Sequence, residues 1–181
     1  MSALSAEAQR RLGLLVILAV LSTAWASVLG ARGVPEITAA AAAPPVAVPP
    51  ACPFPAGLRS AFLAAARDAS LPPSLLYAVA KVESNLSQDA TSSAGALGVL
   101  QVMPATAQSL ALNPAEATTN VLAGARYLRQ MLNEFGTWDL ALAAYNAGPT
   151  AVARAGGAPS SDVLTYVANV EQTWHTHAGC S

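Results

Sequence analysis

One carboxylate of this chain lies on the apolar face of a predicted helix. Glu83 follows Leu76 by seven residues and Val79 by four, which places the three side chains on one helix face. Lys81 lies about 200° away around the helix and faces solvent. Burial among apolar side chains disfavours the ionised form of a carboxyl group, so the pKa of Glu83 should rise. Such a group can hold a proton near neutral pH and donate it as a general acid.

The helical pattern alone leaves a second interpretation of Glu83 open. The residue lies near the end of its predicted helix, next to a polar loop over residues 86–98 that contains two glycines. A carboxylate in that place can also cap a neighbouring backbone turn or pair with an arginine. The periodicity by itself favours this structural interpretation over a catalytic one.

Residues 52–181 predict a small, mainly α-helical domain. Apolar residues recur at the helical period, and no sustained alternation typical of strands is present. Helix starts are indicated by prolines suited to a first turn and by the cap residues Asn120 and Thr137, and Gly148-Pro149 marks a stop. The predicted helices cover residues 58–69, 72–84, 121–135, 138–146 and 161–174, and one more begins at Pro104.

The N-terminal part, residues 1–32, has the pattern of a targeting or anchoring segment. Arg10 and Arg11 precede twenty uncharged, mostly apolar residues, 12–31. This run is long enough to cross a bilayer, but Ala24-Trp25-Ala26 also fits a signal-peptide cleavage site, so both interpretations stay open. Since the basic flank stays inside, we expect the remainder of the chain outside the cytoplasm, in the periplasm or the cell-wall space.

A linker and a pair of cysteines follow this segment. Residues 33–51 contain five prolines and a run of alanines, a composition typical of a spacer. Cys52 and Cys180 bracket the domain, and in an exported chain this placement predicts a disulfide, with two free thiols as the alternative. A metal site of His175, His177 and Cys180 would lack a fourth protein ligand, so we expect no metal.

The composition excludes several classes of protein. Nine Lys+Arg against ten Asp+Glu give a net charge of -1, and 10% of residues are charged, which excludes an electrostatic nucleic-acid binder. The hydrophobic fraction of 54% excludes a fully disordered chain. Because there is one long apolar run, a multi-span transporter is also excluded.

Several short patterns resemble the catalytic domain of soluble lytic transglycosylases, a family similar in fold to goose-type lysozyme. They occur in the family's order: Glu83-Ser84, Ala90-Thr91-Ser92, Gly95-Ala96-Leu97-Gly98, Gln101-Val102-Met103-Pro104, Thr106-Ala107, Asn120, Ala123-Gly124-Ala125-Arg126-Tyr127-Leu128, Ala141-Leu142-Ala143-Ala144-Tyr145-Asn146-Ala147-Gly148-Pro149, and Tyr166-Val167 with Val170. Spaced patterns in order are more specific than one short pattern. The resemblance covers about residues 58–170 and implies an all-α, lysozyme-like domain of two lobes with a central cleft.

The resemblance assigns one residue to proton transfer and others to the substrate. Glu83 matches the family's single catalytic acid. Ser92 matches a loop serine that supports the acid and the substrate, and Gln101 and Met103 match cleft residues that contact sugar. Departures from the family's usual residues, at Leu86, Gln88, Val99-Leu100 and Asp162-Val163, remove no proposed catalytic group.

Two further residues complete the implied site. Tyr145 and Asn146 match a pair that faces the acid across the cleft, with the tyrosine hydroxyl near the carboxyl. The family cleaves the β-1,4 bond between N-acetylmuramic acid and N-acetylglucosamine in peptidoglycan. Glu83 would first protonate the glycosidic oxygen and then take the proton of the muramic C6 hydroxyl, which closes a 1,6-anhydro ring without a cofactor.

Three functions follow as alternatives. The first is an exported lytic transglycosylase, the second a hydrolytic muramidase of the same fold, and the third a wall-binding or assembly-scaffold domain with an unused cleft. The intact set of Glu83, Tyr145 and Asn146 argues against the third. The expected partners are peptidoglycan glycan strands, a membrane if residues 12–31 stay uncleaved, and a secretion or conjugation apparatus if the wall is opened locally. We expect a monomer.

Overall fold

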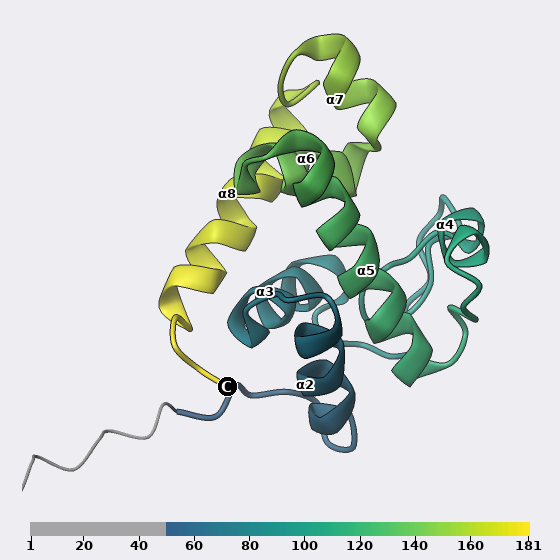
Figure 1. Cartoon of the computed structure of the whole chain (residues 1–181), viewed down its shortest axis with the longest axis vertical. Coiled ribbons are helices and arrows are strands. Elements are labelled where there is room, and N and C mark those ends of the chain that lie inside the picture. The colour runs from purple at the N-terminus through teal and green to yellow at the C-terminus, as the bar shows by residue number, and fades with distance from the viewer. Residues whose placement is uncertain (1–49) are drawn as a thin grey trace, which may run out of the picture. The chain divides into compact units, whose positions relative to one another are not determined.

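The computed structural model describes residues 50–181 (Figure 1). The predicted anchor or signal segment, residues 12–31, and most of the predicted linker, residues 33–51, lie outside the described residues. In the part that is described, no helix combines the length and the apolar character needed to cross a membrane.

The described part of the chain is all-helical, which confirms the predicted fold class. Residues 50–181 form seven helices and no strand: α2 Arg59–Asp68, α3 Pro73–Ser84, α4 Pro104–Ser109, α5 Ala117–Phe135, α6 Trp138–Ala147, α7 Pro149–Ala155 and α8 Ser161–Thr176.

Local signals explain most of the helix ends. Pro73 and Pro104 occupy the first turns of α3 and α4, where the missing N–H of proline costs nothing. The Thr137 side chain accepts a hydrogen bond from the Leu140 N–H at 3.4 Å and so caps α6 as predicted. Gly136 ends α5 in the left-handed conformation, with φ of 77°.

One local prediction was wrong, and one helix was not predicted. Asn120 does not cap α5, because this helix begins three residues earlier, at Ala117. Helix α7 was not predicted at all: Gly148-Pro149 ends α6, but Pro149 also begins this new helix of seven residues. A proline is as compatible with the first turn of a following helix as with a break, and seven residues are too few for a periodic apolar pattern to show.

The packing of the helices places α3 in the interior. Helix α5 packs against both α2 and α6, while α8 packs against α3 and α6. Figure 1 shows α6 and α7 gathered toward one end of the domain and α2 and α3 toward the other, with α5 running between them. Leu75, Leu76 and Val79 on α3 are fully buried. The apolar stripe that predicts the position of Glu83 is therefore the stripe that packs into the core.

The two ends of the domain are joined. The structure contains the predicted disulfide between Cys52 and Cys180, whose Cα atoms are 4.8 Å apart. Beside it, the Ser181 N–H donates to the Pro50 carbonyl at 3.2 Å, and the Arg59 guanidinium donates to the Ser181 carbonyl at 2.8 Å. The bridge also commits the Cys180 sulfur, so it is not a thiolate ligand for a metal.

Candidate active site

The candidate acid, Glu83, lies in the last turn of α3. Its side chain is partly exposed, at the point where the buried stripe of the helix reaches the surface. The Tyr166 hydroxyl of α8 donates a hydrogen bond to Glu83 Oε1 at 2.7 Å. The hydrogen-bond partner of the carboxyl is thus a tyrosine that follows it by 83 residues in the sequence. Within residues 50–181, an ion pair forms between Arg126 and Asp68. Glu83 forms no ion pair with an arginine in this part of the chain, in contrast to the structural interpretation left open by the sequence.

The environment of Glu83 raises its pKa. Burial of the carboxyl raises the pKa from the ordinary 4.5 to about 7, and the hydrogen bond from Tyr166 acts in the opposite direction, because it stabilises the carboxylate. A carboxyl group with a pKa of about 7 exists in both protonation states near neutral pH. It can therefore donate a proton in one step and accept one in the next.

Tyr166 is the residue of this site whose role the sequence analysis did not assign. The Tyr166 pKa is raised well above its ordinary value, first by burial and then by the charge of Glu83, so the hydroxyl keeps its proton and acts as a donor. A signal for it exists in the sequence. Tyr166 follows Val163 by three residues and precedes Val170 by four, and both valines are buried. The same periodicity that places Glu83 on an apolar face places this hydroxyl on one.

The loop between α3 and α4 forms a tightly folded wall beside the acid. Two isolated β-bridges, Thr91 with Leu97 and Leu97 with Val102, fold it back on itself. The Ser84 hydroxyl, one residue after the acid, donates to the Val99 carbonyl at 2.8 Å. This bond ties the loop directly to the end of α3.

Asn120 fixes the same loop from the other side. It is fully buried within α5, and its Oδ1 accepts the Leu100 N–H at 2.9 Å while its Nδ2 donates to the Leu97 carbonyl at 2.7 Å. Gly98, with φ of 72°, leaves room for this amide, because a Cβ at that position would lie 2.7 Å from the Asn120 side chain. Asn120 thus holds loop backbone and does not cap its own helix.

Ser92 shapes the outer part of the loop. Its Oγ accepts the Ala96 N–H at 3.0 Å, and its own N–H donates to the Ala96 carbonyl at 3.0 Å. These two bonds close the turn over residues 92–96. The hydroxyl is therefore engaged with the loop backbone, and its predicted support of the acid and the substrate stays a prediction.

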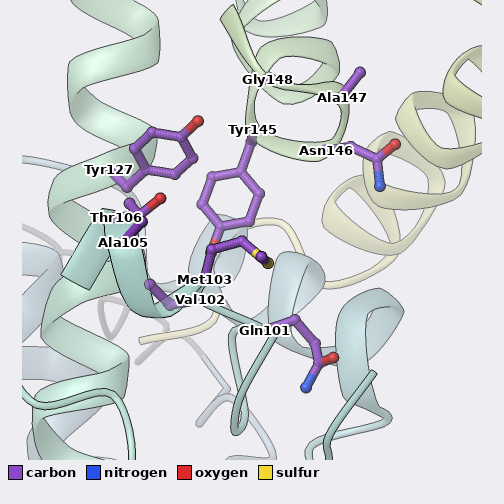
Figure 2. Close-up of a pocket in the computed structure, with 10 residues that line it drawn as sticks. All are labelled: Gln101, Val102, Met103, Ala105, Thr106, Tyr127, Tyr145, Asn146, Ala147 and Gly148. Carbon is purple, nitrogen blue, oxygen red and sulfur yellow. The ribbon is translucent and has the colours of Figure 1, made fainter. Parts of the chain in front are cut away.

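A pocket of about 400 Å³ lies between this loop and helices α4, α5 and α6 (Figure 2). Four of the residues singled out from the sequence line it, namely Gln101, Met103, Tyr145 and Asn146. Its other lining residues are Val102, Ala105, Thr106, Tyr127, Ala147 and Gly148. Glu83 and Ser92 are not among the lining residues. The structure therefore brings Gln101 and Met103 of the loop together with Tyr145 and Asn146 of α6 in one cavity, but it does not bring Ser92 there.

The polar groups of the pocket wall are largely committed to backbone. The Gln101 amide donates to the Gly98 carbonyl at 2.8 Å and to the Ala90 carbonyl at 3.2 Å. The Tyr145 hydroxyl donates to the Leu100 carbonyl at 2.7 Å. The Tyr145 pKa is raised well above its ordinary value, mainly by burial and next by the charge of Glu83. The hydroxyl is thus within the field of the acid while its hydrogen bond goes to the loop.

The walls of the pocket offer apolar and aromatic surface. Figure 2 shows the Tyr145 ring extending from α6 toward the loop that carries Val102 and Met103. The Tyr127 ring of α5 lies beside it, with ring centroids 5.3 Å apart. Met103 is 41% exposed, which is unusual for a large apolar side chain, and Asn146 is exposed. Such a combination of apolar faces and an exposed amide suits a sugar, whose rings have apolar faces and hydroxyl edges.

Comparisons with known proteins show which proteins this chain is similar to. The family model described as the transglycosylase SLT domain matches residues 60–168. A curated relative, the transglycosylase of Enterobacteria phage PRD1, is 41% identical over 86 residues, which are 47% of this chain and 32% of that protein.

The fold is similar to those of solved lytic transglycosylases. An inactive mutant of the lytic transglycosylase Slt from Pseudomonas aeruginosa aligns with a TM-score of 0.58 and 28% identity, over 68% of this chain and 24% of that one. The 70-kDa soluble lytic transglycosylase of Escherichia coli aligns with a TM-score of 0.57 and 26% identity, over 70% of this chain and 25% of that one. The chain thus spans about a third of its curated relative and about a quarter of these larger proteins.

Proposed function

Because the chain belongs to the transglycosylase SLT domain family, we propose that it is a peptidoglycan lytic transglycosylase. It cleaves the β-1,4 bond between N-acetylmuramic acid and N-acetylglucosamine. The observation that supports this most directly is the state of Glu83. Its carboxyl is partly buried, has a pKa of about 7, and receives a hydrogen bond from Tyr166. One group with these properties can serve as both acid and base.

In the first step Glu83 acts as the general acid. The protonated carboxyl transfers its proton to the glycosidic oxygen as the bond from that oxygen to the muramic C1 breaks. Positive charge develops at C1, and the N-acetyl group of the same sugar stabilises it. The carboxylate that remains keeps the hydrogen bond from the Tyr166 hydroxyl, which stabilises the ionised form.

In the second step Glu83 acts as the base. It takes the proton of the muramic C6 hydroxyl while the C6 oxygen bonds to C1, which closes the 1,6-anhydro ring and restores the protonated acid. This hydroxyl is already part of the reacting sugar, so it has a large advantage of proximity over a water molecule. The cycle balances without water, a metal or a second carboxylate.

The pocket described above binds the glycan strand next to the acid. In this proposal Met103 and the tyrosine rings contact the apolar faces of a sugar, and Gln101 and Asn146 lie along its hydroxyl edges. Ser92 supports the acid and the substrate indirectly, since it closes the turn of the loop that forms the wall.

We also propose that the domain works outside the cytoplasm. The disulfide between Cys52 and Cys180 supports this, since such bonds persist in oxidising compartments. Residues 12–31 direct the export, either as a cleaved signal peptide or as an anchor in the inner membrane. The N-terminal sequence of the protein isolated from a membrane or periplasmic fraction distinguishes the two. Recovery of the full chain from the cytoplasm with free thiols would contradict export.

The decisive experiment is a digest of purified peptidoglycan with the full chain, followed by mass spectrometry of the released fragments. Lytic transglycosylase action gives 1,6-anhydro ends, which are lighter than reducing ends by one water. Release of fragments with reducing ends would instead identify a hydrolytic muramidase. Binding to the wall without any release would identify a wall-binding domain and overturn the proposal.

A further inference from the structure

A glycine inside α5 lies where three elements of the pocket meet. A Cβ placed on Gly124 would lie 2.6 Å from both Cβ and Cδ1 of Leu100 and 2.9 Å from the Tyr145 hydroxyl. Contacts of that length are far inside the van der Waals distance of about 3.5–4.0 Å. The loop, α5 and α6 can therefore approach each other to this extent only because residue 124 has no side chain.

The conformation of α5 does not itself require glycine at this position. Gly124 lies in the interior of a 19-residue helix and does not have a positive φ. Glycine in a helix interior is unfavourable relative to alanine, so the helix alone would favour alanine. Glycine at position 124 instead makes room for the close approach of Leu100 and Tyr145 to the helix.

These contacts connect directly to the pocket wall. The Leu100 carbonyl accepts the hydrogen bond of Tyr145, and the Leu100 N–H is held by Asn120, one turn before Gly124 on the same helix. The next residues along the loop, 101–103, line the pocket, and so does Tyr145. The distance between α5 and Leu100 therefore sets where both walls of the pocket lie.

We propose that Gly124 is a positioning residue that sets the shape of the pocket and thereby its affinity for the glycan strand. It acts through Leu100 and Tyr145 and touches no substrate. The inference rests on the proposed function, since it takes the pocket as the site of the sugar. A methyl group at position 124 would shift the loop, because the Leu100 Cβ is attached to its backbone, or would displace the Tyr145 hydroxyl from the Leu100 carbonyl.

The test compares Gly124→Ala with Gly157→Ala on soluble glycan strands. Gly157 is a matched control, because it does not have a positive φ and a Cβ there would meet nothing within 4 Å. For Gly124→Ala we expect KM to rise about tenfold while kcat stays within about twofold, since the acid is untouched and only ground-state binding is lost. The pH dependence of kcat/KM should keep its midpoint, whereas Gly157→Ala should match the wild type throughout.

A double-variant cycle tests whether Gly124 acts through Tyr145. Tyr145→Phe removes the hydroxyl and its hydrogen bond to the Leu100 carbonyl. If the methyl of Gly124→Ala acts by displacing that hydroxyl, the two substitutions disturb the same contact. The KM of Gly124→Ala/Tyr145→Phe should therefore lie well below the product of the two single effects. Effects that simply multiply would overturn the proposed route, and an unchanged KM in Gly124→Ala would overturn the proposal itself.

A second variant keeps the test open if Gly124→Ala does not fold. Leu100→Val withdraws the Cδ1 atom from the junction but keeps the Cβ, so Gly124→Ala/Leu100→Val relieves one of the two close contacts between the new methyl and Leu100. Its KM should be nearer to that of the wild type than that of Gly124→Ala where both fold, and a KM no better than the single variant contradicts the contact. An inactive wild type is a different outcome, because it contradicts the proposed function and not the role of Gly124.

Discussion

The acid side and the pocket side of the candidate active site are stabilised in different ways. Among the described residues, Glu83 has one side-chain hydrogen-bond partner, the Tyr166 hydroxyl, which comes from a helix packed directly on α3. The pocket wall is held through its backbone: the side chains of Ser84, Asn120 and Tyr145 all bond to peptide groups of residues 97–100.

This difference predicts two classes of variant. Burial and one opposing hydrogen bond control the protonation of the acid, so changes at α3 and α8 should alter kcat and the pH dependence. Several backbone bonds share the positioning of the wall, so changes of exposed side chains in the pocket should alter KM alone. Variants in each region test whether this division holds.

Glu83→Gln should have the largest effect of any single substitution. Glutamine keeps the size of the side chain but cannot transfer a proton, and each proton-transfer role is worth roughly 10²–10⁴-fold. With both roles assigned to Glu83, turnover of peptidoglycan should fall by several orders of magnitude. Glu134→Gln, an exposed glutamate on α5, is the matched control and should retain full turnover. Near-normal turnover of Glu83→Gln would remove this residue from the mechanism.

The stability of Glu83→Gln provides a second measurement on the same protein. The pKa of Glu83 rises from 4.5 to about 7 in the folded state, so the folded protein binds this proton more tightly than the unfolded chain. The free energy of unfolding of the wild type therefore loses a contribution as pH rises through about 4.5 to 7. Glutamine does not titrate, so thermal unfolding should show the variant gaining on the wild type across this range. A variant that loses stability at pH 7 would contradict the burial argument.

Tyr166→Phe should shift the pH dependence of the reaction. In the wild type, kcat/KM should fall as pH rises through about 7, because the free enzyme needs a protonated Glu83. The Tyr166 hydrogen bond lowers the pKa of Glu83, so its removal should raise that pKa and move the decline to higher pH. The carboxylate form also loses its donor, and kcat should drop by about tenfold, the cost of one charge-assisted hydrogen bond.

The control for Tyr166→Phe is a tyrosine of similar burial. Tyr77 on α3 is 5% exposed, and its ring packs against Phe54 and His177 at the opposite end of the helix from Glu83. Tyr77→Phe should therefore keep the wild-type midpoint and kcat. An identical midpoint in Tyr166→Phe and Tyr77→Phe would show that the contact to Glu83 does not control its protonation.

The two regions also differ in how far the sequence predicts them. Glu83 is predictable because a polar residue interrupts a 3.6-residue apolar period, and in the structure its side chain lies at the exposed end of that stripe. Tyr166 obeys the same rule on α8, yet its partner could not be predicted, since periodicity identifies an inward face but not the residue opposite. The resemblance to a family placed the Tyr145 hydroxyl near the acid, while its hydrogen bond goes to Leu100.

The loop region shows the limit of local patterns most clearly. The sequence predicts Asn120 as a helix cap because asparagine prefers that position, whereas its hydrogen bonds to the loop reach back 20 and 23 residues. Such bonds depend on how α5 packs beside the loop, and this packing cannot be inferred from a short stretch of sequence around Asn120. The ends of α6 were predictable because Thr137 and Gly148 act on adjacent backbone. The predictions for residues 1–49 remain predictions.

Met103→Ala should have a smaller effect and should be confined to binding. Met103 is 41% exposed in the pocket, so truncation removes contact surface for a sugar without opening the core. We expect KM for glycan strands to rise about three- to tenfold with kcat unchanged, since one or two methylene contacts are worth about 1 kcal/mol. Leu164→Ala is the matched control, because Leu164 is the other large exposed apolar side chain within residues 50–181, at 59%. Equal KM values in the two variants would contradict a binding role for Met103.

Removal of the disulfide should have the smallest effect on the reaction while lowering stability. The bond closes a loop with a sequence separation of 128 residues, at the end of the domain where Ser181 meets Pro50 and Arg59. A bridge of this kind typically stabilises the folded state by about 2–4 kcal/mol, mainly because it restricts the unfolded chain. The double variant Cys52→Ser/Cys180→Ser should therefore unfold at lower denaturant concentration but keep kcat, KM and the pH midpoint below its unfolding transition. A shifted midpoint would mean that the bridge also positions α8, and with it Tyr166 against Glu83. The acid would then depend on the covalent closure of the domain as well as on its single hydrogen bond.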